Sequence, residues 1–163
     1  MNIPTEEECL KILKENDVPD NIVAHLRAVC DFSMKVCDVL EKRKIKVDRK
    51  LVAAAALLHD VKKLEEAHEI KGADLVESLG YPEVAKIIRK HGLSNLGKEE
   101  FKPKAWEEKI VFYSDKRIRG SKVVSVDERF EYIKQRYKRE DIEKELNFTK
   151  KLEKELLGNE IIH

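Results

Sequence analysis

The stretch LVAAAALLHD, residues 51–60, places eight consecutive apolar residues directly before a histidine and a carboxylate. Alanine and leucine are strong helix formers, and Asp48 stands where an N-terminal capping residue belongs. We therefore predict a helix from about Arg49 to Leu64. Because a helix that is apolar on all sides is buried, the pattern puts His59 and Asp60 at or near the core.

A carboxylate at this position needs a partner. An unpaired ionised group in a core of low dielectric costs more free energy than the net stability of a small domain. Asp60 must therefore be neutralised, either by a salt bridge to an arginine or lysine or by a metal ion shared with His59. The stretch alone leaves both alternatives open.

The composition is that of one soluble domain. A chain of 163 residues is long enough to bury a core of its own. Charged residues make up 40% of it, yet the net charge is only +1, which argues against a general nucleic-acid coat protein. No segment has the apolar length of a membrane span, and the N-terminus lacks the pattern of a signal peptide. We expect a soluble cytoplasmic protein that does not bind membranes.

Helical periodicity continues through the rest of the chain. Two capping boxes, Thr5-x-x-Glu8 and Ser125-x-x-Glu128, mark helix starts. In the connection after Asp115, the only adjacent β-branched pair is Val123-Val124, which is too short for a strand. Besides the central helix, the expected helices cover about residues 5–15, 20–43, 68–79, 82–90, 103–114, 125–137 and 140–157. The sequence thus predicts an all-α bundle of roughly seven to eight helices.

The domain organisation follows from the same pattern. We expect a single helical domain over residues 1–163, with a core at about 21–136 and a C-terminal helical extension over 137–163. The last helix is amphipathic. Its apolar face either covers the domain or meets a second copy in a homodimer.

Histidines and carboxylates recur at the ends of these helices. His25 lies on the long second helix, and His68 and His91 bracket the two helices that follow the central one. Asp115 comes directly after another dense apolar run. Imidazole and carboxylate together suit Zn, Fe, Mn, Co or Ni without selecting one, and helical bundles commonly build such sites from several helices.

The order of these residues resembles the motif of the HD-domain superfamily of metal-dependent phosphohydrolases. The pattern His…His-Asp…Asp is matched by His25, His59-Asp60 and Asp115, and the resemblance covers about residues 21–136. Residues 61–63 (VKK) resemble the family's frequent Ile-Gly-Lys, although Lys62 departs from the glycine, so the local turn could differ. Residues 109–114 (KIVFYS) approach the last aspartate as they do in the family.

The resemblance implies a ligand set. His25, His59, Asp60 and Asp115 would hold one divalent transition metal ion (Fe, Mn, Zn, Co or Ni). Some family members add two histidines and a second ion. His68 and His91 resemble that pair, and Asp60 would then bridge both ions. Hydrolysis by a metal-activated water is the implied reaction, with Asp60 at its centre.

Several cations are candidates for contacts with a substrate phosphate. By resemblance, Lys63 would lie near the metal centre in a catalytic and substrate-binding role. Arg117, Arg119 and Lys122 follow Asp115 and could form a second phosphate grip. For these cations the alternative is a solvated position at a helix end or in a loop.

Three functions remain to be compared. The leading one is a phosphohydrolase that acts on a nucleotide or a related small-molecule phosphate ester. The alternative is a metal-containing module that binds nucleotides or regulates without turnover. Binding of nucleic acid through the basic residues of 42–50 is the least favoured, because the net charge is close to zero. The sequence does not identify the substrate.

Overall fold

The computed structural model of the protein describes residues 1–139 and 141–163, with α3 (Arg49–Leu58) at its centre. Seven of the ten side chains of α3 are buried, as the apolar run predicts. The Asp48 carboxylate caps the helix by accepting from the backbone N–H of Leu51. Four helices pack around it: α1 (Glu6–Glu15), α2 (Asp20–Lys42), α5 (Pro82–Arg89) and α6 (Trp106–Asp115).

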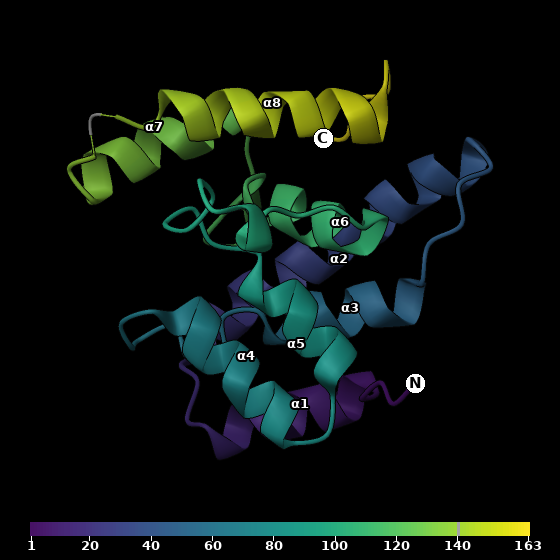
Figure 1. Ribbon diagram of the computed structural model, residues 1–163, viewed down its shortest axis with the longest axis vertical. Helices are drawn as coiled ribbons and strands as arrows, with labels where there is room; N and C mark the ends of the chain where they lie inside the picture. The colour runs from purple at the N-terminus through teal and green to yellow at the C-terminus, as the bar shows by residue number, and fades with distance from the viewer. Residues whose placement is uncertain (140) are drawn as a thin grey trace.

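The remaining elements complete two sides of the molecule. They are α4 (His68–Ser78), the 3₁₀ turn η1 (Glu99–Phe101), β1 (Ile118–Arg119), β2 (Lys122–Val123), α7 (Val126–Arg136) and α8 (Glu143–Leu157). Figure 1 shows α7 and α8 on one side of α6 and α2, with α1, α4 and α5 on the opposite side. The described residues thus form eight α-helices, one short 3₁₀ turn and one hairpin of two two-residue strands, which confirms the all-α prediction.

The residues predicted to cap two helices do so, and the full capping box forms at the first of them. Thr5 Oγ1 accepts from the backbone N–H of Glu8, whose carboxylate accepts in turn from the N–H of Thr5. Ser125 Oγ accepts from the N–H of Glu128 at the start of α7. By contrast, α6 begins at Trp106 rather than at Pro103.

The central helix ends six residues earlier than expected, at Leu58 rather than Leu64. Beyond it the backbone forms tight turns, in which the N–H of Val61 donates to the carbonyl of Leu58 and the N–H of Lys63 to that of Asp60. On a regular helix, neighbouring side chains point about 100° apart. The tighter turn instead lets consecutive residues face the same centre.

The turn also answers the question raised by Lys62. Lys62 does not adopt a positive φ, so this position does not require the conformational freedom of glycine. Its ammonium group pairs with Glu65 at 3.4 Å, away from the centre. The departure from the family's glycine is therefore compatible with the same turn.

The apolar face of the last helix, α8, packs against other helices of the same chain. Leu152, Leu156 and Leu157 of α8 are buried, and α8 packs on α2, α6 and α7. Arg43 donates to the carbonyls of Glu155 and Leu156, both at 2.8 Å. The apolar face that suggested a homodimer is thus occupied by the chain itself.

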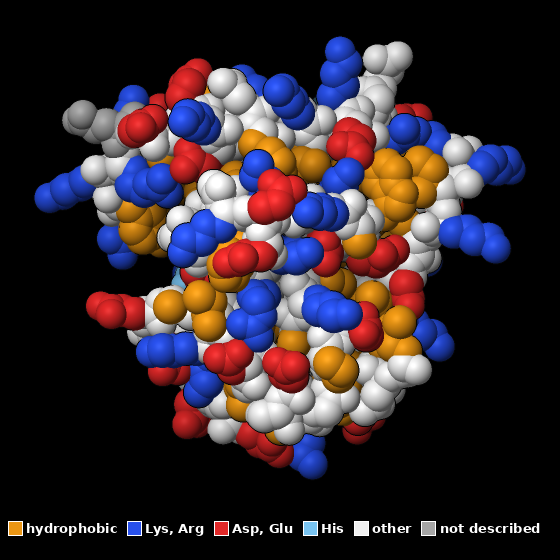
Figure 2. All heavy atoms as spheres, viewed as in Figure 1, with side chains coloured by type: hydrophobic (Ala, Val, Ile, Leu, Met, Phe, Trp, Pro, Cys, Tyr) orange, Lys and Arg blue, Asp and Glu red, His pale blue; other side chains and the backbone are white. Residues whose placement is uncertain are grey.

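The surface carries charges of both signs. Figure 2 shows Lys and Arg interspersed with Asp and Glu over the face that it draws. Within the part of the chain that the structure describes, no helix combines the length and apolar character needed to cross a bilayer.

Candidate metal centre

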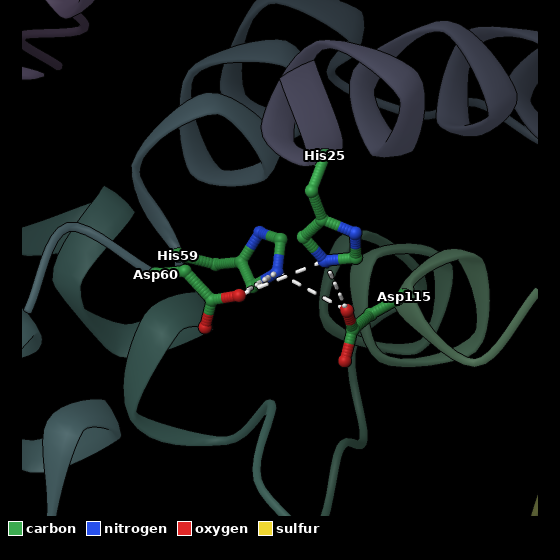
Figure 3. A group of neighbouring side chains, drawn as sticks. All are labelled: His25, His59, Asp60 and Asp115. Atoms are coloured by element: carbon green, nitrogen blue, oxygen red, sulfur yellow. Dashed lines mark hydrogen bonds and ion pairs between the residues drawn. The ribbon is translucent and has the colours of Figure 1, made fainter. Parts of the chain in front are cut away.

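Four polar side chains converge where α2, α6 and the turn after α3 meet. They are His25 from α2, His59 and Asp60 from the turn, and Asp115 at the end of α6 (Figure 3). Nε2 of His25 lies 3.0 Å from Oδ1 of Asp115, and Nε2 of His59 lies 3.3 Å from the same oxygen. Oδ2 of Asp60 lies 3.6 Å and 3.4 Å from these two nitrogens. One ligand atom from each of the four residues lies within 4.8 Å of the others.

A second group shares Asp60 with the first. Its other oxygen, Oδ1, lies 3.4 Å from Nε2 of His68 and 3.3 Å from Nε2 of His91. These three residues also bring their ligand atoms within 4.8 Å of one another. Asp60 therefore directs one oxygen to each group, in the bridging arrangement that the resemblance implied.

The four imidazole rings are oriented in the same way. In each ring Nε2 faces the carboxylates, and Nδ1 faces an acceptor of the protein. The Nδ1 partners are the carbonyl of Gly120 for His25 (2.8 Å), that of Ala56 for His59 (2.7 Å), that of Ile88 for His91 (2.6 Å) and the Glu69 carboxylate for His68 (3.5 Å). A carbonyl only accepts, so Nδ1 carries a hydrogen, and the lone pair of a neutral ring is then on Nε2. Metal-ligating histidines are held in this manner.

The electrostatics of the cluster call for a cation. Burial lowers the pKa of His59, but Asp60 and Asp115 outweigh it and raise that pKa to about 10. Burial also opposes ionisation of both carboxylates, yet the histidines, and for Asp115 also the buried Lys116, hold their pKa values well below the usual range. In the absence of another cation, His59 therefore holds a proton at neutral pH beside the ionised carboxylates of Asp60 and Asp115.

His91 gives a second sign that the donors fit a metal ion. Its Nε2 is buried and, among the described residues, makes no hydrogen bond, although Asp60 Oδ1 is only 3.3 Å away. Burial lowers the pKa of His91, which keeps the ring neutral with its lone pair free. Buried polar atoms are rarely left unpartnered, and mixed imidazole and carboxylate donors suit divalent transition metals.

A cavity of about 360 Å³ opens beside both groups. Asp60, His68, His91 and Asp115 line it, and so does Lys63. Its volume lies within the usual range for small-ligand sites. The molecule is hollowed at the left edge of Figure 2, where a histidine side chain is visible.

Lys63 is half-buried at this cavity. Burial disfavours its ammonium form, but Asp60 and Asp115 more than offset that effect and raise its pKa. Lys63 is therefore charged at neutral pH and placed to meet an anion. This position agrees with the one implied by the family resemblance, which put Lys63 near the metal centre.

The structure corrects the expected phosphate grip after Asp115, because none of its three residues lines this cavity. Arg117 is buried and donates to the carbonyls of Val124 (2.6 Å) and Ile162 (2.8 Å) and to the Tyr113 hydroxyl (2.8 Å). Arg119 stacks over a tyrosine on α7, and Lys122 is exposed on β2.

Arg117 is accordingly expected to stabilise the fold. Arg117→Met should lower the free energy of unfolding by about 3 kcal/mol and the melting temperature by roughly 10 °C, because it leaves buried carbonyls and a hydroxyl unpaired. KM for a phosphate substrate should stay within about twofold. Thermal melts and steady-state kinetics test this, with exposed Arg119→Met as the matched control. A large rise in KM at an unchanged melting temperature would restore Arg117 as a phosphate ligand.

Three cations at the cavity, Lys116, Arg129 and Arg139, escaped the sequence argument. Lys116 is buried and donates to Asp115 Oδ2 (2.7 Å) and to the carbonyl of His91 (3.1 Å). Its position next to Asp115 was the available signal, but the pattern did not show which of the neighbouring cations turns inward. Arg129, on α7, also lines the cavity, and no motif marks it.

Glu69 is a buried carboxylate that packs against Gly92 and faces Nδ1 of His68. A Cβ at Gly92 would lie 3.1 Å from Cδ of Glu69, closer than ordinary van der Waals contact. Glycine at this position thus lets Glu69 approach the ring.

Gly92→Ala should shift Glu69 and loosen His68. We expect affinity for an ion at His68 and His91 to fall by about tenfold, with the ion at His25 unaffected. Metal titration of the chelator-treated protein would separate the two sites. Gly97→Ala is the matched control, since a Cβ there meets nothing within 4 Å. Equal affinities in both variants would exclude this positioning role for Glu69.

Comparisons with known proteins agree with the geometry. A family model described as HD domain matches residues 22–154, so the match continues past the expected core boundary into α8. An uncharacterized protein of Methanocaldococcus jannaschii is 32% identical over 136 aligned residues, which cover 75% of this chain and 80% of that protein. No solved structure gives a significant match.

Two further relatives are longer proteins. A tRNA (cytidine(56)-2'-O)-methyltransferase of Picrophilus torridus is 28% identical over 168 aligned residues, covering 94% of this chain and 47% of that protein. A protein of the same name from Thermoplasma volcanium is 28% identical over 134 aligned residues, which cover 74% of this chain and 38% of that protein. The chain thus spans about half or less of these two relatives. With the family match over residues 22–154 and the motif residues gathered at one centre, the chain belongs to the HD-domain family.

Proposed function

We propose that the protein is a metal-dependent phosphohydrolase that cleaves a nucleotide or a related phosphate ester with water. The observation that carries the proposal is the pair of donor groups joined by Asp60, opening on a cavity lined by cations. Membership of the HD-domain family supports it. A divalent ion held by these residues would supply an activated water and positive charge for the phosphoryl oxygens.

The residues have separate roles in this proposal. One ion would be held by His25, His59, Asp60 and Asp115, and a second by Asp60, His68 and His91. In the reaction the oxygen of water bonds to phosphorus, the ester P–O bond breaks, and the alcohol leaves with a proton. Lys116, which lies next to Asp115, would stabilise the charge on the phosphoryl oxygens, and Lys63 would bind substrate phosphate from the same cavity.

A nucleoside is the favoured alcohol. Tyr137 lines the cavity and is 55% exposed, so its ring can stack on a base. Two relatives are named for a reaction on tRNA, which makes RNA-derived nucleotides worth testing. Methyl transfer is not proposed for this chain, which covers 47% and 38% of those relatives.

The test joins metal analysis with a substrate panel. We expect close to two transition-metal ions per chain in the purified protein, and release of phosphate or a nucleotide from at least one mono-, di- or triphosphate or cyclic ester. Chelation should stop the release and metal should restore it. Two ions with no product from any ester, together with nucleotide binding by calorimetry, would favour the non-catalytic module. One ion per chain would confine the site to the first donor group.

A further inference from the structure

Arg129 is a cation without a counterion in the described part of the chain. Nε and Nη1 of its guanidinium group are shielded from solvent and have no hydrogen-bond partner. Within residues 1–139 and 141–163, no carboxylate oxygen lies within 4.0 Å of it. The residue nevertheless lines the same cavity as Asp60, His91 and Asp115. The guanidinium carbon lies 5.8 Å from the centroid of the Tyr132 ring, but this contact satisfies none of its N–H donors. Shielding those donors without a hydrogen-bond partner is unfavourable, so an anionic ligand at this position would satisfy them.

The other cations of the cavity differ in how far they are already paired. Lys116 donates to Asp115 and Arg139 pairs with Glu145 at 3.1 Å. Lys63, like Arg129, forms no ion pair among the described residues. Two unpaired positive charges therefore lie on the cavity beside the metal ligands.

One phosphate group does not need both of these charges. At the proposed centre, the ester phosphate that is cleaved would already be matched by the metal ions and by Lys116. Lys63 and Arg129 remain for negative charge carried elsewhere on the substrate. A cavity of about 360 Å³ has room for more than one phosphate group.

We propose that Arg129 is a specificity residue which, with Lys63, binds a second phosphate group of the substrate. The preferred substrate is then an ester of a diphosphate or longer oligophosphate rather than of a monophosphate. This inference rests on the proposed function for the position of the first phosphate. The planar guanidinium can form two parallel hydrogen bonds to phosphate oxygens, which a lysine cannot.

Calorimetry with two probes that resist hydrolysis tests the inference without relying on activity. Metal-loaded parent protein should bind methylenediphosphonate at least about tenfold more tightly than methylphosphonate. Arg129→Gln should weaken methylenediphosphonate binding by about 10- to 100-fold and leave methylphosphonate within about twofold. Arg129→Lys should fall between the two. Lys134→Gln removes one positive charge from an exposed position of the same helix and should change neither affinity.

Metal content is measured before and after each titration, so that removal of metal by the probe is seen equally in parent and variant. Equal weakening of both probes by Arg129→Gln, or none, would overturn the inference. Should that variant not fold, a parent that binds the two probes within about twofold of each other overturns it alone.

The two proposals fail in different ways. Selective diphosphonate binding that depends on Arg129, in a protein that hydrolyses no ester, would support the inference and refute the proposed function. Hydrolysis of monophosphates that is indifferent to Arg129→Gln would support the function and refute the inference.

Discussion

Asp60→Asn should remove both metal ions and lower phosphate-ester hydrolysis by about 10³-fold or more. Asp60 is the one residue common to both donor groups, with Oδ2 toward His25 and His59 and Oδ1 toward His68 and His91. Asparagine keeps the shape but not the negative charge. Its amide can present an oxygen to only one group, while its NH₂ is turned toward the lone pairs of the other.

Elemental analysis of parent and variant, followed by kinetics in added metal, measures this effect. A thermal melt shows whether the variant is folded. Asp31→Asn, an exposed carboxylate on α2, is the matched control and should keep both ions and the parent rate. A folded Asp60→Asn protein that retains two ions and hydrolyses esters at the parent rate would refute the metal mechanism.

The apolar run and the capping residues were enough to predict most of the fold. An uninterrupted apolar helix has only one place in a domain of this size, which is the centre, and α3 lies there. The end of α3 was not predictable in the same way, because residues 59–64 contain no glycine or proline. The helix ends at Leu58, directly before His59 and its long-range contact with Asp115, and local propensity does not report such a contact.

In the candidate site too, the motif residues were predictable from the sequence, whereas the groups that orient them were not. The order His25, His59-Asp60, Asp115 follows from a motif, and the structure brings these side chains together. The groups that orient the rings are mostly backbone carbonyls, and a carbonyl leaves no trace in a sequence. Gly120, for example, lies 95 positions from His25 in the chain.

The direction of side chains in loops was the other obstacle. The sequence does not show which of the cations after Asp115 faces the cavity. Lys116 lines it, whereas Arg117 is buried and donates to a backbone carbonyl. Arg129 stands on a different helix and reaches the cavity only through the packing of α7. Such choices depend on which backbone carbonyls are left to be paired, and these are fixed only when the helices assemble.

Metal-free protein should lose thermal stability as the pH rises from 6.5 to 8.5, whereas metal-loaded protein should not. In the metal-free protein Asp60 and Asp115, working against burial, raise the pKa of His59 to about 10. A folded pKa above the unfolded value gives stability that is complete below about 6.5 and declines as the pH rises toward 10. Over two pH units the loss is about 3 kcal/mol, or roughly 6–12 °C in melting temperature.

Among the other buried groups, Lys116 acts in the opposite direction, because burial lowers its pKa and stability then rises with pH above that lowered value. The remaining buried groups do not reverse the trend within the window. The pKa values of Asp60 and Asp115 are lowered, so their contribution is complete above about pH 4 and constant here. Burial lowers the pKa of His91, and that contribution changes only below about 6.5. Burial raises the pKa of the Cys9 thiol to about 12, which would begin to destabilise the fold only above about 8.5, and the window ends there.

Melting curves at pH 6.5, 7.5 and 8.5, with and without metal, give the answer. A metal ion held by these residues would replace the proton, and its affinity would rise as the ligands deprotonate. The difference in melting temperature between loaded and metal-free protein should therefore widen with pH. His59→Gln removes the titrating ring, and its metal-free melting temperature should stay level across the window. A metal-free parent whose melting temperature is constant or rises would show that no proton is held between these carboxylates, and the electrostatic argument for a cation at this centre would fail.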